Sequence, residues 1–305
     1  MTHKAKKSKL SNHGQLFVIS LPAILSILAF AYLPMFGLFI AFKDINYQKG
    51  IFGSDWVGFK NFDFFFKSQD AFRITRNTIL YNVVFIVLGL SMAVIVAMLL
   101  YSMSRKAIKF YQTVLFFPYF LSWVIVGYLS YIFLSPTSGV LNQLVAMFGG
   151  ESLNWYAESK YWPFILVFFN IWKNLGYNAI IFYTGLMSID SSLYEAASID
   201  GANSFQQKIH ITLPLIKSLV IIMVILAVGK IMCADFGMFY FIPRDTGSIY
   251  AATDVIDTYV YRALRVTGEL GMSAAASFYQ SVVGCVLVVA TNLIIKKVSP
   301  DDAIF

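Results

Sequence analysis

The chain has 305 residues, of which 58% are hydrophobic, 17% are aromatic and 13% are charged. A soluble globular domain carries about 25% charged residues, so the composition excludes an ordinary water-soluble fold and indicates a membrane protein. The net charge of +7 does not indicate nucleic-acid binding, because the basic residues lie in short segments between apolar runs. Cys233 and Cys285 lie inside apolar runs without metal-ligand spacing, so we expect neither a metal site nor a disulfide framework.

Six long apolar runs follow one another along the chain. Each reaches the roughly 20 residues that a helix needs to cross a hydrocarbon core of about 30 Å, which predicts an all-α polytopic membrane protein. The first run is too long for a signal-peptide core and lacks a small-residue cleavage pattern, so we expect it to be retained. The predicted spans are 16–42, 79–103, 110–134, 161–187, 214–236 and 272–296, in a domain over 16–298 that has tails over 1–15 and 299–305.

Basic residues in the short loops predict the orientation of these spans. Four basic segments fall on one side of a six-span topology, and the positive-inside rule places that side in the cytoplasm. The segment before the second span falls on the other side and is mixed, with six basic residues and four aspartates. Both termini and the polar loop over 190–214 are therefore expected in the cytoplasm. The four segments contain Lys4, Lys6, Lys7 and Lys9; Arg105, Lys106 and Lys109; Lys208 and Lys217; and Lys296 and Lys297.

The fourth predicted span carries a polar stripe inside the membrane. Its members recur at i, i+3, i+4, i+7 and i+8, which places them on one face of a helix. A charged residue at a span centre costs about 2.5–3.5 kcal/mol on insertion scales, so it normally faces a cavity or a partner. The stripe therefore either lines a substrate path, where amides and a phenol bind hydroxyl groups of a ligand, or joins the span to neighbouring helices or to a second membrane subunit. The stripe is Asn170, Lys173, Asn174, Tyr177 and Asn178.

Four further residues in or near the spans are candidates for the same path. Aromatic side chains can stack on a ring of a ligand, amides can bind its hydroxyl groups, and a lysine can line the same cavity. Each also has an ordinary role in packing or at the membrane interface. They are Trp123, Lys230, Tyr279 and Gln280.

The loop between the fourth and fifth spans contains SLYEAASIDGANSFQQKIHITLPL, from Ser192 to Leu215. Ser192 followed by Glu195 fits a capping box at the start of a helix. Small side chains follow, and Gly201 permits a bend or a left-handed turn that a bulky residue would resist. A helix that lies on lipid shows a strong apolar moment with many Lys or Arg residues opposite, and this one has neither. A short helix with small side chains is better suited to a groove on another protein.

The same stretch carries a resemblance to a known family. Glu195-Ala196-Ala197, three residues, Gly201, nine residues and Ile211-x-Leu213-Pro214 resemble the EAA loop of binding-protein-dependent ABC importer permeases. The extension with Asp200 and Ala202 is similar to the carbohydrate branch. The resemblance implies a type I ABC importer permease fold and a coupling helix that docks in a cleft of an ATPase subunit. It assigns this docking role to Glu195, Ala196, Ala197, Asp200, Gly201, Ala202 and Phe205.

Other segments extend the resemblance over most of the chain. VGFKNF (57–62) and DAFRITRNT (70–78) resemble the segment before the second span of sugar permeases, whereas DVIDTYVYR (254–262) and FYQSVVG (278–284) resemble the polysaccharide subgroup. The resemblance implies alternating access in a bacterial cell membrane. It also implies a second, related permease as heterodimer partner, two copies of a P-loop ATPase, and an extracellular solute-binding protein, expected to be a lipoprotein. The expected substrate is an oligosaccharide.

The chain is not expected to be an enzyme or to bind a cofactor itself. It contains no GxxxxGK[ST] sequence, so ATP and Mg²⁺ are expected on the partner ATPase. A membrane-embedded enzyme is disfavoured, because the spans contain no histidine and no HExxH pattern. Two alternatives remain: an ion-coupled secondary transporter, which would need a carboxylate in the membrane or an inverted repeat, and an ABC permease for a solute other than sugar.

Overall fold

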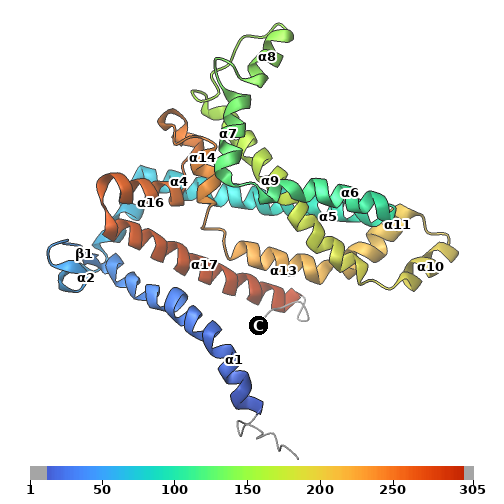
Figure 1. Ribbon diagram of the computed structural model, residues 1–305, viewed down its shortest axis with the longest axis horizontal. Helices are drawn as coiled ribbons and strands as arrows, with labels where there is room; N and C mark the ends of the chain where they lie inside the picture. The colour runs from blue at the N-terminus through green and yellow to red at the C-terminus, as the bar shows by residue number, and fades with distance from the viewer. Residues whose placement is uncertain (1–11, 299–305) are drawn as a thin grey trace, which may run out of the picture. The chain divides into compact units, whose positions relative to one another are not determined.

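Helices make up most of the computed structural model, which describes residues 12–298 (Figure 1). Among these residues the only strands are β1 (Lys43–Asp44) and β2 (Asp55–Trp56), which pair antiparallel with Lys43 opposite Trp56. The predicted all-α class is therefore confirmed. Lys4, Lys6, Lys7 and Lys9, and the tail expected over 299–305, lie outside the described residues.

The chain divides into two compact units. Of the described residues, the first comprises 12–63 together with Glu269–Phe278, and the second comprises Phe64–Gly268 and 279–298. In the first unit an aromatic cluster follows the first long helix: Phe42 stacks on Trp56 with ring centroids 5.7 Å apart and meets Phe278 edge-on at 5.4 Å. The helices up to Lys67 are α1 (Asn12–Ile27), a π-helical turn (Leu28–Tyr32), a 3-10 stretch (Leu33–Phe42), α2 (Gly50–Gly53), a 3-10 turn (Lys60–Phe62) and α3 (Asp63–Lys67).

Helices of the second unit form the larger part of the fold. The long α9 packs along α5 and α6, and close approach to α6 requires Gly176, because a Cβ there would lie 2.0 Å from the Leu115 carbonyl oxygen. The remaining α-helices are α4 (Gln69–Val84), α5 (Leu90–Tyr101), α6 (Arg105–Phe116), α7 (Trp123–Leu134), α8 (Val140–Met147), α9 (Trp162–Met187), α10 (Ser191–Ile199), α11 (Ser204–Gln207), α12 (Leu213–Leu215), α13 (Lys217–Val228), α14 (Phe236–Phe241), α15 (Tyr250–Thr253), α16 (Ile256–Arg262) and α17 (Leu270–Val298).

Short 3-10 and π-helical turns connect several of these helices. The 3-10 turns are Phe117–Phe120, Ser159–Tyr161 and Gly247–Ile249, and the π-helical turns are Phe85–Gly89, Lys208–Thr212 and Ala263–Thr267.

Four helical segments are long and apolar enough to cross a membrane, and the number rises to six if each of two bent pairs forms one span. The bent pairs are Arg105–Phe120 with Trp123–Leu134, at 97°, and Ser204–Leu215 with Lys217–Val228, at 57°. The sequence predicts single helices over 110–134 and 214–236, so these two expectations are corrected. The unbroken segments are Leu16–Phe42, Gln69–Tyr101, Ser159–Met187 and Leu270–Lys297.

The sharper bend has a local cause. Pro118 has no N–H to donate to the preceding helical turn, and the 3-10 turn that contains it ends at Phe120. Ser122 then begins a new helix, because its Oγ accepts the Ile125 N–H at 3.3 Å. Figure 1 shows α6 and α7 leaving this point in very different directions.

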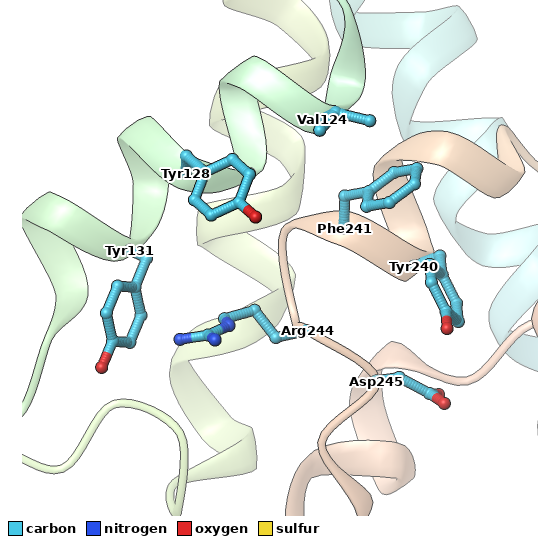
Figure 2. Close-up of a pocket in the computed structure, with 8 residues that line it drawn as sticks. Val124, Tyr128, Tyr131, Tyr240, Phe241, Arg244 and Asp245 are labelled. Atoms are coloured by element: carbon cyan, nitrogen blue, oxygen red, sulfur yellow. The ribbon is translucent and has the colours of Figure 1, made fainter.

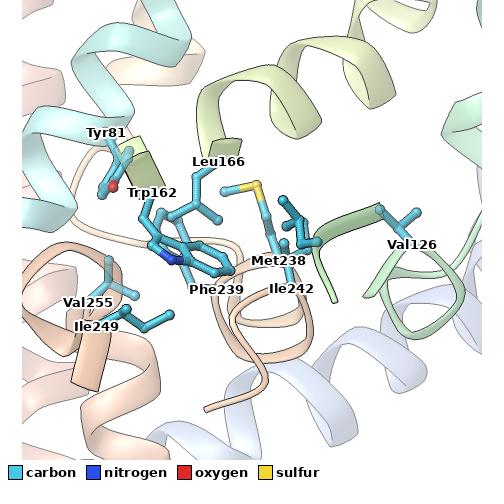
Figure 3. Packing of buried hydrophobic residues seen from close by; sticks show 10 residues of the cluster. Tyr81, Val126, Trp162, Leu166, Met238, Phe239, Ile242, Ile249 and Val255 are labelled. Carbon is cyan, nitrogen blue, oxygen red and sulfur yellow. The ribbon is translucent and has the colours of Figure 1, made fainter. Parts of the chain in front are cut away.

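A hydrophobic core joins α4, α7, α9 and α14 with the segment that follows α14. Trp162 and Leu166 of α9 are fully buried against Met238 and Ile242 (Figure 3). The Trp162 indole N–H donates to the Trp155 carbonyl at 2.8 Å, so the polar atom of this large ring is satisfied. This core fixes the end of α9 that leads to the polar residues described next.

Candidate functional site

A polar cavity of about 650 Å³ lies beside the middle of α9. Asn170, Asn174 and Asn178 line it together with Lys230, which follows α13. Four of the residues predicted for a substrate path therefore share one cavity. The other lining residues are Asn82, Phe85, Ile86, Leu90, Met223, Leu226, Ala227, Cys233, Ala234 and Asp235.

Lys173 does not line this cavity but lies at the bend between α6 and α7. Its side chain is only 7% exposed, and its ammonium donates to the carbonyls of Tyr119 at 2.8 Å and Leu121 at 2.5 Å. The Pro118 carbonyl accepts at 3.3 Å. The Tyr119 and Leu121 carbonyls lie at the end of the 3-10 turn, where helical hydrogen bonds stop. The Lys173 ammonium supplies the hydrogen-bond donors that they would otherwise lack. This placement matches the packing alternative for Lys173.

Tyr177 lies on the same side of α9 as Lys173. Its ring stacks on Tyr119 with centroids 4.6 Å apart and an interplanar angle of 8°. The stripe predicted from the sequence therefore divides along the helix axis. Its i, i+4 and i+8 members face the cavity, and its i+3 and i+7 members face the bend.

Two of the other candidate residues, Trp123 and Gln280, make hydrogen bonds to the segment between α13 and α14. The Trp123 indole N–H donates to the Asp235 carboxylate at 2.6 Å, and the same carboxylate accepts the Met238 N–H at the start of α14. Gln280 is buried and donates to the Met232 carbonyl at 2.7 Å. Tyr279 does not line the cavity. Trp123 and Gln280 thus do not line the cavity but bind the segment after α13, part of which does.

The sequence reasoning missed Asn82. Its amide lines the cavity and donates to the Ile231 carbonyl at 2.9 Å and the Cys233 carbonyl at 3.2 Å. The signal was present, since an asparagine inside an apolar run carries the same cost as those in the fourth span.

Replacing Asn178 by alanine is expected to weaken substrate binding. Within residues 12–298 its amide makes no hydrogen bond, so the amide is available to a ligand hydroxyl in the cavity. Loss of one neutral hydrogen bond costs about 0.5–1.5 kcal/mol, which corresponds to a roughly 2- to 10-fold higher KM for uptake. Transport kinetics in membrane vesicles measure this. An unchanged KM would separate Asn178 from the substrate path.

The polar loop over 190–214 forms α10 and α11, and its first helix is capped differently from the prediction. Asp190, not Ser192, is the N-cap of α10, and its carboxylate accepts the Ser192 N–H at 3.0 Å. Within the described chain Glu195 makes no hydrogen bond, so the predicted capping box is wrong. The hydrogen bond from Ser192 lowers the pKa of Asp190, and this cap persists at neutral pH and is lost only as pH falls below the usual carboxyl range near 3.9.

Asp190→Ala is expected to fray the start of α10, whereas Ser192→Ala is expected to leave it unchanged. Loss of an N-cap costs about 0.5–2 kcal/mol. Hydrogen–deuterium exchange over Ser191–Ile199 should therefore accelerate roughly 2- to 30-fold in Asp190→Ala alone. Faster exchange in Ser192→Ala instead would restore the capping box.

The end of α10 turns at Gly201, which has a φ of +81°. The Ala202 N–H donates to the Ala197 carbonyl at 2.9 Å and the Gly201 N–H to the Ser198 carbonyl at 3.2 Å, which are the two bonds of a Schellman motif. A left-handed residue at this position favours glycine.

A hollow of about 360 Å³ lies beside this turn. Ala197, Asp200, Gly201 and Ala202 line it, so four of the seven predicted coupling residues share one surface. Beside the turn, Ile199 is 86% exposed and Phe205 is 69% exposed. Glu195 and Ala196 are exposed on α10 but do not line the hollow. The remaining lining residues are Gln206, Gln207, His210 and Ile211.

The chain is similar in sequence to curated proteins of Bacillus subtilis. The chain is 36% identical to Protein LplB of Bacillus subtilis (strain 168) over 284 residues, which cover 92% of this chain and 88% of that protein. It is 35% identical to the polygalacturonan/rhamnogalacturonan transport system permease protein YteP of the same strain over 290 residues, covering 95% and 90%.

A solved structure extends the similarity to the fold. The crystal structure of a bacterial alginate ABC transporter in complex with alginate pentasaccharide-bound periplasmic protein contains a chain that matches with a TM-score of 0.84 and 30% identity, over 93% of this chain and 95% of that one. Residues 71–300 match the family described as "Binding-protein-dependent transport system inner membrane component". The predicted resemblance is confirmed: the chain belongs to the binding-protein-dependent transport system inner membrane component family.

Proposed function

We propose that the chain is the permease subunit of an ATP-driven importer that moves an oligosaccharide into the cell. The observation that carries this proposal is the turn at Gly201 and the hollow beside it, in a chain of this family. Similarity to permeases and a transporter named for polysaccharides supports the substrate class. An ion-coupled mechanism and a solute other than sugar are less favoured by the same comparisons.

The proposed orientation places both termini and the loop over 190–214 in the cytoplasm of a bacterial cell. The basic loops support this side, and a family description as an inner membrane component supports the cytoplasmic membrane. Counting each bent pair as one span gives the six crossings that bring both termini to one side. Within the second unit, α10 lies far from α7 and α14 (Figure 1), so those two helices lie toward the outer side in this orientation.

The proposed mechanism is alternating access. A second, related permease forms the other half of the path, and a sugar-loaded binding protein, expected to be a lipoprotein, docks outside. Two P-loop ATPase subunits hold ATP and Mg²⁺ and close inside the cell. The exposed side chains of Ile199 and Phe205 beside the hollow offer them an apolar docking surface. Closure is transmitted through α10 and opens the path outward, and hydrolysis resets it.

The cavity beside α9 is the proposed substrate path. Asparagine amides both donate and accept hydrogen bonds, which matches the hydroxyl groups of a sugar. Lys230 adds a cation at the cavity. Neither ATP hydrolysis nor cofactor binding is assigned to this chain.

Purification of the tagged chain from its native membrane in mild detergent tests the proposal. The expected result is co-purification of a second six-span permease and of a P-loop ATPase in two copies. A chain that emerges alone or as a homo-oligomer at every detergent strength would overturn the proposal. In that case α10 would be an interfacial helix.

A further inference from the structure

A second pocket lies between α7 and the turn after α14, away from the polar cavity. It has a volume of about 180 Å³, below the roughly 300–1,000 Å³ of sites that hold drug-sized ligands. This size suits a single ring and not a chain of rings. No residue is shared with the polar cavity beside α9. The pocket is lined by Val124, Gly127, Tyr128, Tyr131, Tyr240, Phe241, Arg244 and Asp245 (Figure 2).

Arg244 brings an unpaired positive charge to this aromatic pocket. Its guanidinium carbon lies 4.1 Å from the centroid of the Tyr131 ring. Among residues 12–298 no carboxylate pairs with it. A guanidinium that lies over a ring and has no carboxylate beside it keeps N–H groups available, and these match a carboxylate in bidentate geometry. The arrangement therefore presents an anion-binding edge beside aromatic faces.

Asp245 is the other charged group in the lining, and it is already neutralised. Its carboxylate accepts from Arg262 at 2.8 Å and from the Tyr250 hydroxyl at 2.8 Å. Figure 2 shows the Arg244 side chain extending toward Tyr131 and the Asp245 side chain pointing the other way. Asp245 therefore does not cancel the charge that Arg244 offers to a ligand.

The backbone at these two residues is unusual. Arg244 has a φ of 56° and Asp245 a φ of 48°, so two consecutive residues other than glycine are left-handed. Such backbone is costly and persists where its surroundings impose it, often at binding sites. Here Arg262 anchors the turn, because it pairs with Asp245 and also with Asp254, which is 1% exposed. With this left-handed backbone, the Arg244 side chain extends toward Tyr131.

We propose that this pocket binds one carboxylate-bearing sugar ring, a uronic acid unit, of the transported oligosaccharide. The sugar carboxylate binds the N–H edge of Arg244, and C–H groups of the ring pack on the electron-rich tyrosine faces. The inference rests on the proposed function, since the orientation given above places this end of α7 outside. It narrows the substrate from an oligosaccharide to an acidic one, captured before it reaches the polar cavity.

The test measures direct binding without the binding protein. Saturation-transfer NMR is recorded on the purified full-length chain with its bound subunits, using trigalacturonate and the same trisaccharide with its carboxyl groups reduced to alcohols. The expected result is a trigalacturonate signal that weakens roughly 10-fold or more in Arg244→Gln, as loss of a charge-assisted pair implies. The reduced sugar should give a weak signal that the variant does not change.

Two further variants make the result specific. Arg265→Gln removes the same charge from an exposed arginine outside the pocket and should leave both signals unchanged. Arg244→Lys keeps the charge but loses the planar fork, so it should bind trigalacturonate with intermediate strength. Gln at 244 meets the same backbone demand as Arg, which keeps the comparison free of a change in turn strain.

Three outcomes would overturn the inference: an unchanged trigalacturonate signal in Arg244→Gln, equal signals from the two sugars with the wild type, or no signal from either. The last would favour an acidic side chain of another protein as the occupant. Normal ATP-driven uptake combined with any of these outcomes leaves the proposed function standing. An Arg244-dependent trigalacturonate signal from a chain that co-purifies with no ATPase would support the pocket and overturn the proposed function.

Discussion

Gly201→Asp is expected to insert and assemble normally and to lose uptake almost completely. A Cβ at this position meets no atom within 4 Å, so an aspartate side chain has room, but the left-handed backbone at φ +81° strains any residue other than glycine. The carboxylate of this aspartate would lie in the hollow beside Asp200 and, in the proposed complex, remain unpaired when the ATPase docks. A buried unpaired charge at an interface costs about 2–5 kcal/mol, which lowers ATP-driven uptake at least roughly 30-fold. Vesicle uptake, with membrane insertion checked by blotting, measures the effect.

Gly201→Asn is the matched control for this variant. Asparagine has nearly the same shape, adopts left-handed backbone more readily than most residues, and carries no charge. It should retain about 10-fold more uptake than the aspartate variant if charge at the docking surface is the cause. Normal uptake by Gly201→Asp would remove the coupling role from this turn.

Lys173→Met is expected to destabilise the protein more than a change to Asn174 in the polar cavity. The methionine fills most of the space but leaves the carbonyls of Pro118, Tyr119 and Leu121 without their donor. Leaving such groups unsatisfied costs roughly 2–5 kcal/mol in total, which lowers the midpoint of thermal unfolding by about 5–10 °C. Size-exclusion chromatography of detergent extracts after heating measures the midpoint.

Asn174→Leu is the neighbouring control, because it changes the cavity and not the bend. Its amide donates to the Asn170 carbonyl, one turn earlier in the same helix, so no carbonyl at the bend depends on it. This variant should alter substrate affinity while its unfolding midpoint stays close to that of the wild type. If Lys173→Met is as stable as the wild type and only its affinity changes, Lys173 belongs to the substrate path after all.

For the polar stripe, periodicity predicts the helix face but not the neighbour that each side chain contacts. A spacing of i, i+3, i+4, i+7 and i+8 correctly placed five residues of α9 on one face. That face is wide enough to meet two neighbours, the bend at Leu121 and the cavity. Which residue meets which neighbour depends on the direction of α7, and the periodicity of α9 does not encode it. For this reason Lys173 and Asn174, although adjacent in sequence, contact different neighbours: the bend and the cavity.

The sharper bend was visible in the sequence only as local signals. Pro118 and Ser122 are a helix breaker and an N-cap, but they lie inside one apolar run, and hydropathy averages over them. The cap of α10 was misplaced by two residues because Asp190 and Ser192 are both good N-caps. The first helical residue decides between them, and helix boundaries are set by packing as much as by sequence.

The turn at Gly201 was predictable because its chemistry is local. Gly201 follows a run of small residues at the place where a helix ends with a left-handed residue, and the structure has that φ and the two Schellman hydrogen bonds. The pocket at Arg244 was not predictable. It depends on Tyr131 of α7 meeting a turn more than a hundred residues later, and on an anchor at Arg262.

Reconstitution in proteoliposomes tests the central claim most directly. The chain is combined with its co-purifying permease and ATPase, and uptake of a radiolabelled acidic oligosaccharide is followed with the ATPase side and the binding-protein side supplied separately. We expect uptake to require ATP on one side of the membrane and sugar-loaded binding protein on the other. Gly201→Asp is expected to abolish this uptake. Uptake driven by an ion gradient in the absence of ATP would contradict the claim.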